Sequence, residues 1–134
     1  MKGVYPILLT QGDSFIVVSI PDFGINTQGV DTAEAIYMAR DAIGLMGIDM
    51  QDKGEMLPKP SVASEIEKEN ENDLITLVDV DFDEYRRKND MRIVKKNCTI
   101  PAWLNYEAEK AGLSFSGLLA EAIRHKLGLP DRVY

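Results

Sequence analysis

The chain has 134 residues, a length that suits one ordinary domain or two very small ones. Its composition, 45% hydrophobic and 28% charged, is close to the average for soluble globular proteins, which excludes wholesale disorder, a collagen-like repeat and a coiled coil. A net charge of −7 and an isoelectric point near 4.7 argue, for the chain as a whole, against nucleic-acid binding.

The charge is distributed unevenly along the chain. Residues 1–90 hold 8 basic and 18 acidic side chains, a net charge of −10. Residues 91–134 hold 7 basic and 4 acidic side chains, a net charge of +3. A step of this size within one chain predicts two modules with different partners.

An intrachain disulfide framework is excluded because Cys98 is the single cysteine. The first residues, Met1–Val4, lack the basic region and the long apolar core of a secretory signal. No apolar run approaches the roughly 20 residues that cross a bilayer. We therefore expect a cytoplasmic protein in a reducing compartment, with no membrane partner.

The first two elements form a predicted β-hairpin. The runs Val4–Thr10 and Ser14–Ile20 are rich in apolar and β-branched residues, and a short connection containing Gly12 joins them. Pro6 has no N–H to donate, so the first strand should be an edge at this residue or begin after it. The second run is apolar on consecutive residues, which predicts that both of its faces are covered.

A third, weaker strand is predicted over Ile25–Val30, and a helix follows it. Asp31 and Glu34 have the spacing of a capping box, and apolar residues then recur at helical intervals. Gly44 and Gly47 weaken the prediction for the second half of this helix.

Residues 65–73 are acidic and predict either a solvated helical turn or a mobile loop. Leu74–Val80 is a strong strand signal. The resulting order, β-β-β-α-β over residues 1–81, indicates an α+β module in which a helix packs on a mainly antiparallel sheet. The polar, charged segment 82–90 is predicted to be a linker.

The pattern after the linker predicts a strand and two helices. They are the strand Met91–Ile100, the helix Ala102–Ala111, and a second helix from Ser114 or Ser116 to about Leu127. Pro101 stops the strand, and Gly112 is placed to cap the first helix at its C-terminus.

A module of about 44 residues, 91–134, is too small to bury enough apolar surface by itself. Its single strand also has no local partner for its backbone groups. Both problems are solved if two chains pair these strands antiparallel and pack their four helices together. We therefore expect a homodimer through this module, with the possibility of a higher oligomer.

The run from Lys95 to Pro101, together with the joint Gly112–Ser116, resembles the ribbon-helix-helix repressors, the group that contains the methionine and Arc repressors. In this family a two-stranded antiparallel ribbon enters the major groove of DNA. The resemblance implies a DNA-binding dimer. Lys96 departs from the family pattern, because it falls on the face where the family usually has an apolar residue.

Alternation along the ribbon separates a DNA face from a core face. The predicted base-contacting residues are Lys95, Asn97 and Thr99, whose side chains can bond base edges. The predicted dimer core is Cys98, Ile100, Leu104, Leu119 and Ile123. The predicted phosphate contacts are Ser114, Phe115 and Ser116 at the start of the second helix, and Arg92. Ordinary surface exposure for the lysines and simple helix capping for the serines are the alternatives.

Residues 4–81 resemble the partially preserved ribonuclease H-like domain of HicB-type antitoxins. The matching segments are Tyr5-Pro6, Ser19–Gly24, Thr27–Thr32, Leu57–Ser61, Val78–Asp81 and Tyr85–Lys88. The sequence departs from the family at Asp22–Ile25, where members often carry a Pro-Gly-Cys-like turn.

This resemblance implies the antitoxin half of a type II toxin–antitoxin pair. The implied partner is a small basic HicA-like ribonuclease with a double-stranded-RNA-binding-like fold and a catalytic histidine. The N-terminal module would occlude this toxin, and the C-terminal module would repress the shared operon by binding double-stranded operator DNA. A module of charge −10 suits a basic partner, because complementary fields speed encounter.

An enzyme is the competing interpretation, since a ribonuclease H-type site needs carboxylates that converge on two metal ions. Asp13 and Asp22 lie in predicted turns, and Asp79 and Asp81 project from one strand face near its end. No metal-ligand signature or phosphate-binding glycine loop is present, and the lone His125 lies in the other module. We expect no catalytic residue, no metal and no cofactor.

A third interpretation is a ligand-responsive ribbon-helix-helix repressor whose N-terminal module binds a small corepressor and which has no toxin partner. The two repressor interpretations differ in their expected gene neighbourhood. A short basic open reading frame beside the gene favours the antitoxin.

Overall fold

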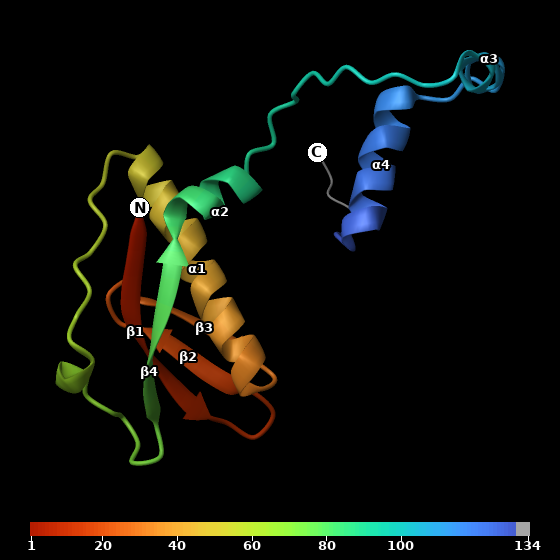
Figure 1. The fold of residues 1–134 in the computed structure, drawn as a ribbon. Helices are drawn as coiled ribbons and strands as arrows, with labels where there is room; N and C mark the ends of the chain where they lie inside the picture. Colours follow the sequence, from red (N-terminus) through yellow and green to blue (C-terminus); the bar gives the residue numbers. More distant parts are fainter. Residues whose placement is uncertain (131–134) are drawn as a thin grey trace. The chain divides into compact units, whose positions relative to one another are not determined.

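A computed structural model describes residues 1–130, and in it the chain divides into two units, Met1–Asp90 and Met91–Tyr134 (Figure 1). The first unit is a mixed α+β structure, as the sequence predicts. Among residues 1–130 no helix is both long enough and apolar enough to cross a membrane.

One antiparallel sheet forms the framework of the N-terminal unit. Its strands are β1 (Lys2–Gln11), β2 (Ile16–Ile20), β3 (Ile25–Gly29) and β4 (Leu74–Asp81), in the spatial order β3-β2-β1-β4. Helix α1 (Thr32–Asp52) lies between β3 and β4 in the chain and packs across the sheet (Figure 1). The predicted order β-β-β-α-β is confirmed.

Pro6 lies in β1 at a position where the sheet tolerates it. β2 pairs with β1 only from Leu8 onward, so Pro6 has a strand neighbour on one side, at Leu77 of β4. The Asp79 carbonyl points away from β1, because it accepts a 3.0 Å hydrogen bond from Nε of Arg40. Alternation along an antiparallel pair then puts Pro6 opposite Leu77 at a non-hydrogen-bonded position. The expectation of a local edge at Pro6 is confirmed, although the strand begins before it.

The prediction that both faces of β2 are covered is wrong. Ile16, Val18 and Ile20 are buried, but Val17 between them is 44% exposed. The reason is that α1 covers one face of the sheet, and alternation turns Val17 to the other. The continuous buried run lies instead in β1, from Tyr5 to Leu9.

Helix α1 begins at the predicted cap and runs through both of its glycines. The Asp31 carboxylate accepts the N–H of Glu34 at 2.8 Å. The Glu34 carboxylate reaches back to the N–H of Val30 at 3.4 Å, one residue before the cap, so the capping box is displaced by one position.

The segment 82–90, predicted as a linker, instead holds helix α2 (Phe82–Lys88) and belongs to the N-terminal unit. Phe82 is fully buried in the core, and Tyr85 packs against that core. A Cβ at Gly47 would lie 2.2 Å from the Phe82 ring, and one at Gly44 would lie 2.5 Å from the Tyr85 ring. The two glycines that weakened the helix prediction are therefore the surface on which α2 packs.

Tyr85 is expected to ionise late in an alkaline titration. Its burial, with the nearby Asp41 carboxylate, raises the pKa of Tyr85 from 10.0 to about 12. The unfolded chain loses this proton at lower pH than the folded chain, so the associated stability is complete below pH 10 and is lost between pH 10 and about 12. Phenolate absorbance should show this late step, and Tyr85→Phe should remove it. Burial also raises the pKa of Tyr5, so a late step of undiminished amplitude in Tyr85→Phe would be the result that assigns it to another tyrosine.

The C-terminal unit contains the two predicted helices. They are α3 (Ala102–Lys110) and α4 (Phe115–Leu127). Gly112, with φ of +69°, ends the first helix in the left-handed conformation that glycine adopts at little cost. Ser114 is the cap of α4, and its Oγ accepts the N–H of Gly117 at 3.3 Å.

The predicted strand Met91–Ile100 is not formed in the single chain. Residues 90–101 are assigned to neither helix nor strand, and residues 91–100 are all exposed. A β-strand exists only when a second strand satisfies its N–H and C=O groups. Among residues 1–130, no strand pairs with this segment.

Candidate functional site

The C-terminal unit leaves its apolar side chains exposed. Among its described residues, 91–130, Ala108 is the single buried side chain, at 9% exposure. A unit with so little buried apolar area cannot offset the entropy cost of ordering its chain.

Four of the predicted dimer-core residues, Ile100, Leu104, Leu119 and Ile123, are between 39% and 49% exposed, and Cys98 is exposed as well. Leu119 and Ile123 are four residues apart on α4, so they share one face of the helix. Leu104 lies four residues before the buried Ala108 on α3. These helical residues therefore lie on apolar stripes that are exposed to solvent in the single chain. Their burial in a dimer stays a prediction.

The predicted base-contacting residues, Lys95, Asn97 and Thr99, are exposed in the segment before α3, as is Arg92. Their role in DNA binding stays a prediction.

The predicted phosphate contacts lie in and beside the first turn of α4. The hydroxyls of Ser114 and Ser116 are 3.5 Å apart, and Ser114 rather than Ser116 caps the helix. The N–H groups of a first helical turn have no carbonyl partner within the helix, so they can bond an anion. The last turn carries basic residues, including His125, which suits the negative end of the helix dipole.

The carboxylates of the enzyme interpretation serve separate contacts. Asp22 accepts hydrogen bonds from the N–H and hydroxyl of Ser61, the former at 2.9 Å. Asp79 pairs with Arg40 at 3.1 Å, and Asp81 accepts the N–H groups of Asp83 and Glu84 in the first turn of α2. Within residues 1–130 no group of three or more His, Cys, Asp or Glu side chains could hold a metal ion.

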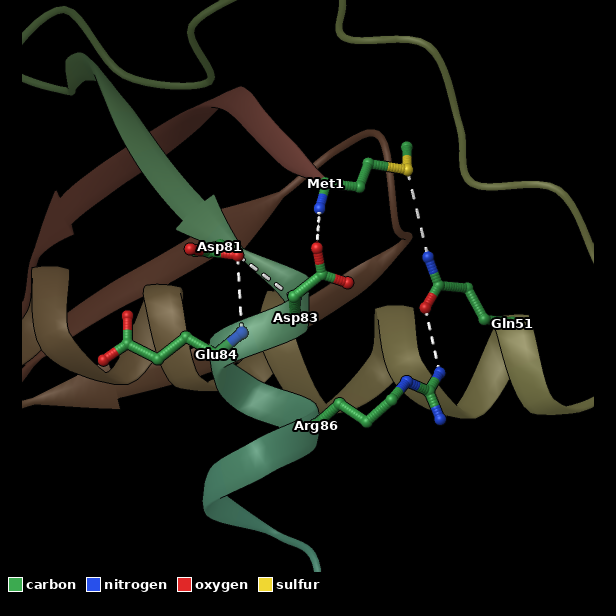
Figure 2. A network of polar contacts seen from close by, with 6 residues as sticks. All are labelled: Met1, Gln51, Asp81, Asp83, Glu84 and Arg86. Carbon is green, nitrogen blue, oxygen red and sulfur yellow. Dashed lines mark hydrogen bonds and ion pairs between the residues drawn. The ribbon is translucent and has the colours of Figure 1, made fainter.

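A polar network joins the start of β1 to α2 and to the end of α1 (Figure 2). The Met1 amino group pairs with Asp83 and, by its hydrogen bond and charge, lowers the pKa of this carboxyl. Gln51 donates to the Met1 sulfur at 3.9 Å and accepts from Arg86 at 2.9 Å. Arg86 also pairs with Asp52 at 2.7 Å. The network adds polar contacts to the apolar packing that holds α2 on the N-terminal unit.

The N-terminal unit has a pocket of about 300 Å³ near the C-terminal end of α1. It is lined by Asp22, Phe23, Met46, Met50, Glu55, Met56 and Pro58. The pocket is not predicted by the sequence patterns above, although two of its methionines, Met46 and Met50, recur at helical spacing. We call it the methionine pocket.

The two units and their opposite charges are typical of a protein with two kinds of partner, and comparison with known proteins identifies the class as an antitoxin. The family described as "HicB_like antitoxin of bacterial toxin-antitoxin system" matches residues 5–123. The chain therefore belongs to the HicB-like antitoxin family, which confirms the resemblance found in its sequence. A search of curated proteins gives no match.

Two solved structures resemble the chain over nearly its whole length. A chain of a toxin–antitoxin complex from Streptococcus pneumoniae is 28% identical, with a TM-score of 0.59 over 94% of this chain and 99% of that one. The antitoxin HicB of Burkholderia pseudomallei is 24% identical, with a TM-score of 0.54 over 93% of this chain and 96% of that one. At this lower identity, the second likeness supports the fold alone.

Proposed function

We propose that this antitoxin neutralises a small basic HicA-like ribonuclease through its N-terminal unit and represses its own operon through its C-terminal unit. The observation that carries the proposal is the coincidence of two boundaries. The structural division between residues 90 and 91 falls where the charge changes from −10 to +3.

The N-terminal unit supplies a stable acidic surface for a basic partner. Its core is built from β1, β2, β4, α1 and Phe82, with Ile25 of β3 packed against it, so its surface is held without help from the second unit. An acidic surface attracts a basic toxin and disfavours RNA, which would compete for the same toxin. Neutralisation is then steric, by occlusion of the RNA-binding and catalytic surface, and needs no chemistry from a partial ribonuclease H-like domain.

The C-terminal unit is proposed to be a ribbon-helix-helix module. A second copy of the chain would supply the missing strand partner and cover the open apolar stripes, because both chains carry the same residues. The paired ribbon would present Lys95, Asn97 and Thr99 of each chain to the major groove of an inverted repeat. Two such dimers on adjacent half-sites would add avidity.

Growth assays with fragments test the division of labour. Residues 1–90 should restore growth to cells that express the small basic toxin encoded beside this gene, and residues 91–134 should not. Residues 1–81 are the informative control, because they lack Phe82 and Tyr85 and should fail to fold stably. Rescue by 91–134 alone would overturn the proposed roles.

The methionine pocket keeps a second function open, that of a ligand-responsive repressor without a toxin partner. A volume of about 300 Å³ is at the lower limit for a small-molecule site. Co-expression with the neighbouring small gene, followed by pull-down and operator gel shift, separates the two functions. No co-purifying toxin, together with operator release by a small molecule, would favour the ligand-responsive repressor.

A further inference from the structure

We propose that the methionine pocket receives one lysine or arginine side chain of the basic toxin and anchors it on the antitoxin. This inference rests on the proposed function, since it specifies which feature of the toxin the N-terminal unit recognises. The methionine pocket is one contact surface within that unit.

Three of the lining residues, Asp22, Phe23 and Pro58, are held in place by contacts within the N-terminal unit. Phe23 packs edge-on against Tyr5, with ring centroids 4.9 Å apart. The Tyr5 hydroxyl donates to the Pro58 carbonyl at 3.0 Å, and Ser61 holds Asp22 by two hydrogen bonds. Side chains that are ordered before binding lower the entropy cost of association.

The lining suits a long aliphatic chain. Met46 and Met50 are half-buried on α1, while Met56, which follows the turn at the end of α1, is 90% exposed. Methionine is flexible and polarisable, so it adapts to the shape of an inserted chain. Insertion of such a chain would remove the apolar surface of Met56 from water.

Two carboxylates in the pocket lining, those of Asp22 and Glu55, suit a cation. Gly54, with φ of +74°, turns the chain at the end of α1, and the N–H of Glu55 donates to the Met50 carbonyl at 2.9 Å. This turn places the Glu55 carboxylate at the negative end of a 21-residue helix, and Asp22 lines the same pocket. Apolar walls with carboxylates complement the aliphatic stem and cationic head of lysine or arginine.

Two substitutions at exposed positions test the pocket in the full chain. Met56→Arg puts a cation and a bulky chain into it, and Glu55→Lys reverses a charge in its lining. Val62→Arg and Glu67→Lys are matched controls, because they make the same changes on exposed residues outside the lining. Binding would be measured by calorimetry, with the product of the neighbouring small basic gene inactivated at its catalytic histidine.

Both pocket variants should bind the toxin at least tenfold more weakly, with the controls within twofold of the parent chain. Melting curves would establish whether each variant is folded. If one pocket variant is unfolded, the affinity of the other pocket variant tests the assignment. Parent-like affinity in a folded pocket variant overturns the pocket assignment and leaves the proposed function intact. Failure of the parent chain to bind the toxin overturns both. Equal losses in variants and controls would indicate a general charge effect and also overturn the assignment.

Discussion

Asn97→Ala and Lys95→Ala are each expected to weaken specific operator binding by about 1–3 kcal/mol and to relax base preference at one position of each half-site. Both residues share one face of the proposed ribbon, and their side chains suit adenine and guanine respectively. In the single chain both are exposed and lie in a segment without regular structure. Their alignment toward DNA therefore depends on formation of the ribbon by two chains.

Gel shifts with the full chain on its own promoter would measure this effect. Lys110→Ala is a matched control for Lys95→Ala, because it removes the same charge from an exposed site on α3, where the ammonium lies 5.9 Å from the centre of the Tyr106 ring. The control should keep its base preference. Affinity of the parent chain should also fall steeply with salt, because phosphate contacts release counterions. Unchanged binding in both ribbon variants would refute the ribbon assignment.

Gly47→Ala is expected to destabilise the N-terminal unit, although alanine is the better helix former. The new methyl group would lie 2.2 Å from the ring of Phe82, which is fully buried and cannot move aside freely. Overpacking of a core costs about 1–3 kcal/mol, occasionally more. Replacement of a helical glycine by alanine stabilises the helix by about 1 kcal/mol, which offsets part of this cost. Because the clash is with an immobile ring, we expect the overpacking cost at the upper end of this range and a net loss of about 2 kcal/mol.

Thermal unfolding would measure this loss, and a second substitution would locate its cause. Each kcal/mol lowers the Tm of a unit of this size by roughly 4–8 °C. Phe82→Leu creates space at the contact, so the double variant should be more stable than the sum of the two single losses predicts. Strict additivity would show that the clash with Phe82 is not the cause. Loss of α2 packing should also weaken toxin neutralisation, since α2 completes the core of the N-terminal unit.

Some features were predictable because they depend on neighbours in the chain. The hairpin, α1 with its Asp31 cap and the Gly112 end of α3 follow from alternation, helical spacing and capping chemistry. The change of charge at residue 90 is likewise a property of the sequence, and a whole-chain net charge of −7 conceals it. A resemblance carried by short motifs in a fixed order then identified the family.

Other features depend on residues that are distant in the chain, and only the tertiary structure decided them. Gly44 and Gly47 are unfavourable in an isolated helix. They are needed here because the rings of Phe82 and Tyr85, some forty residues later, pack directly on them. The same contact converts the predicted linker into α2. The methionine pocket is lined by residues from two parts of the chain, Asp22 with Phe23 and the segment 46–58, which the turn after α1 brings together. Periodicity reports which face of an element is apolar, but the tertiary fold decides what covers that face.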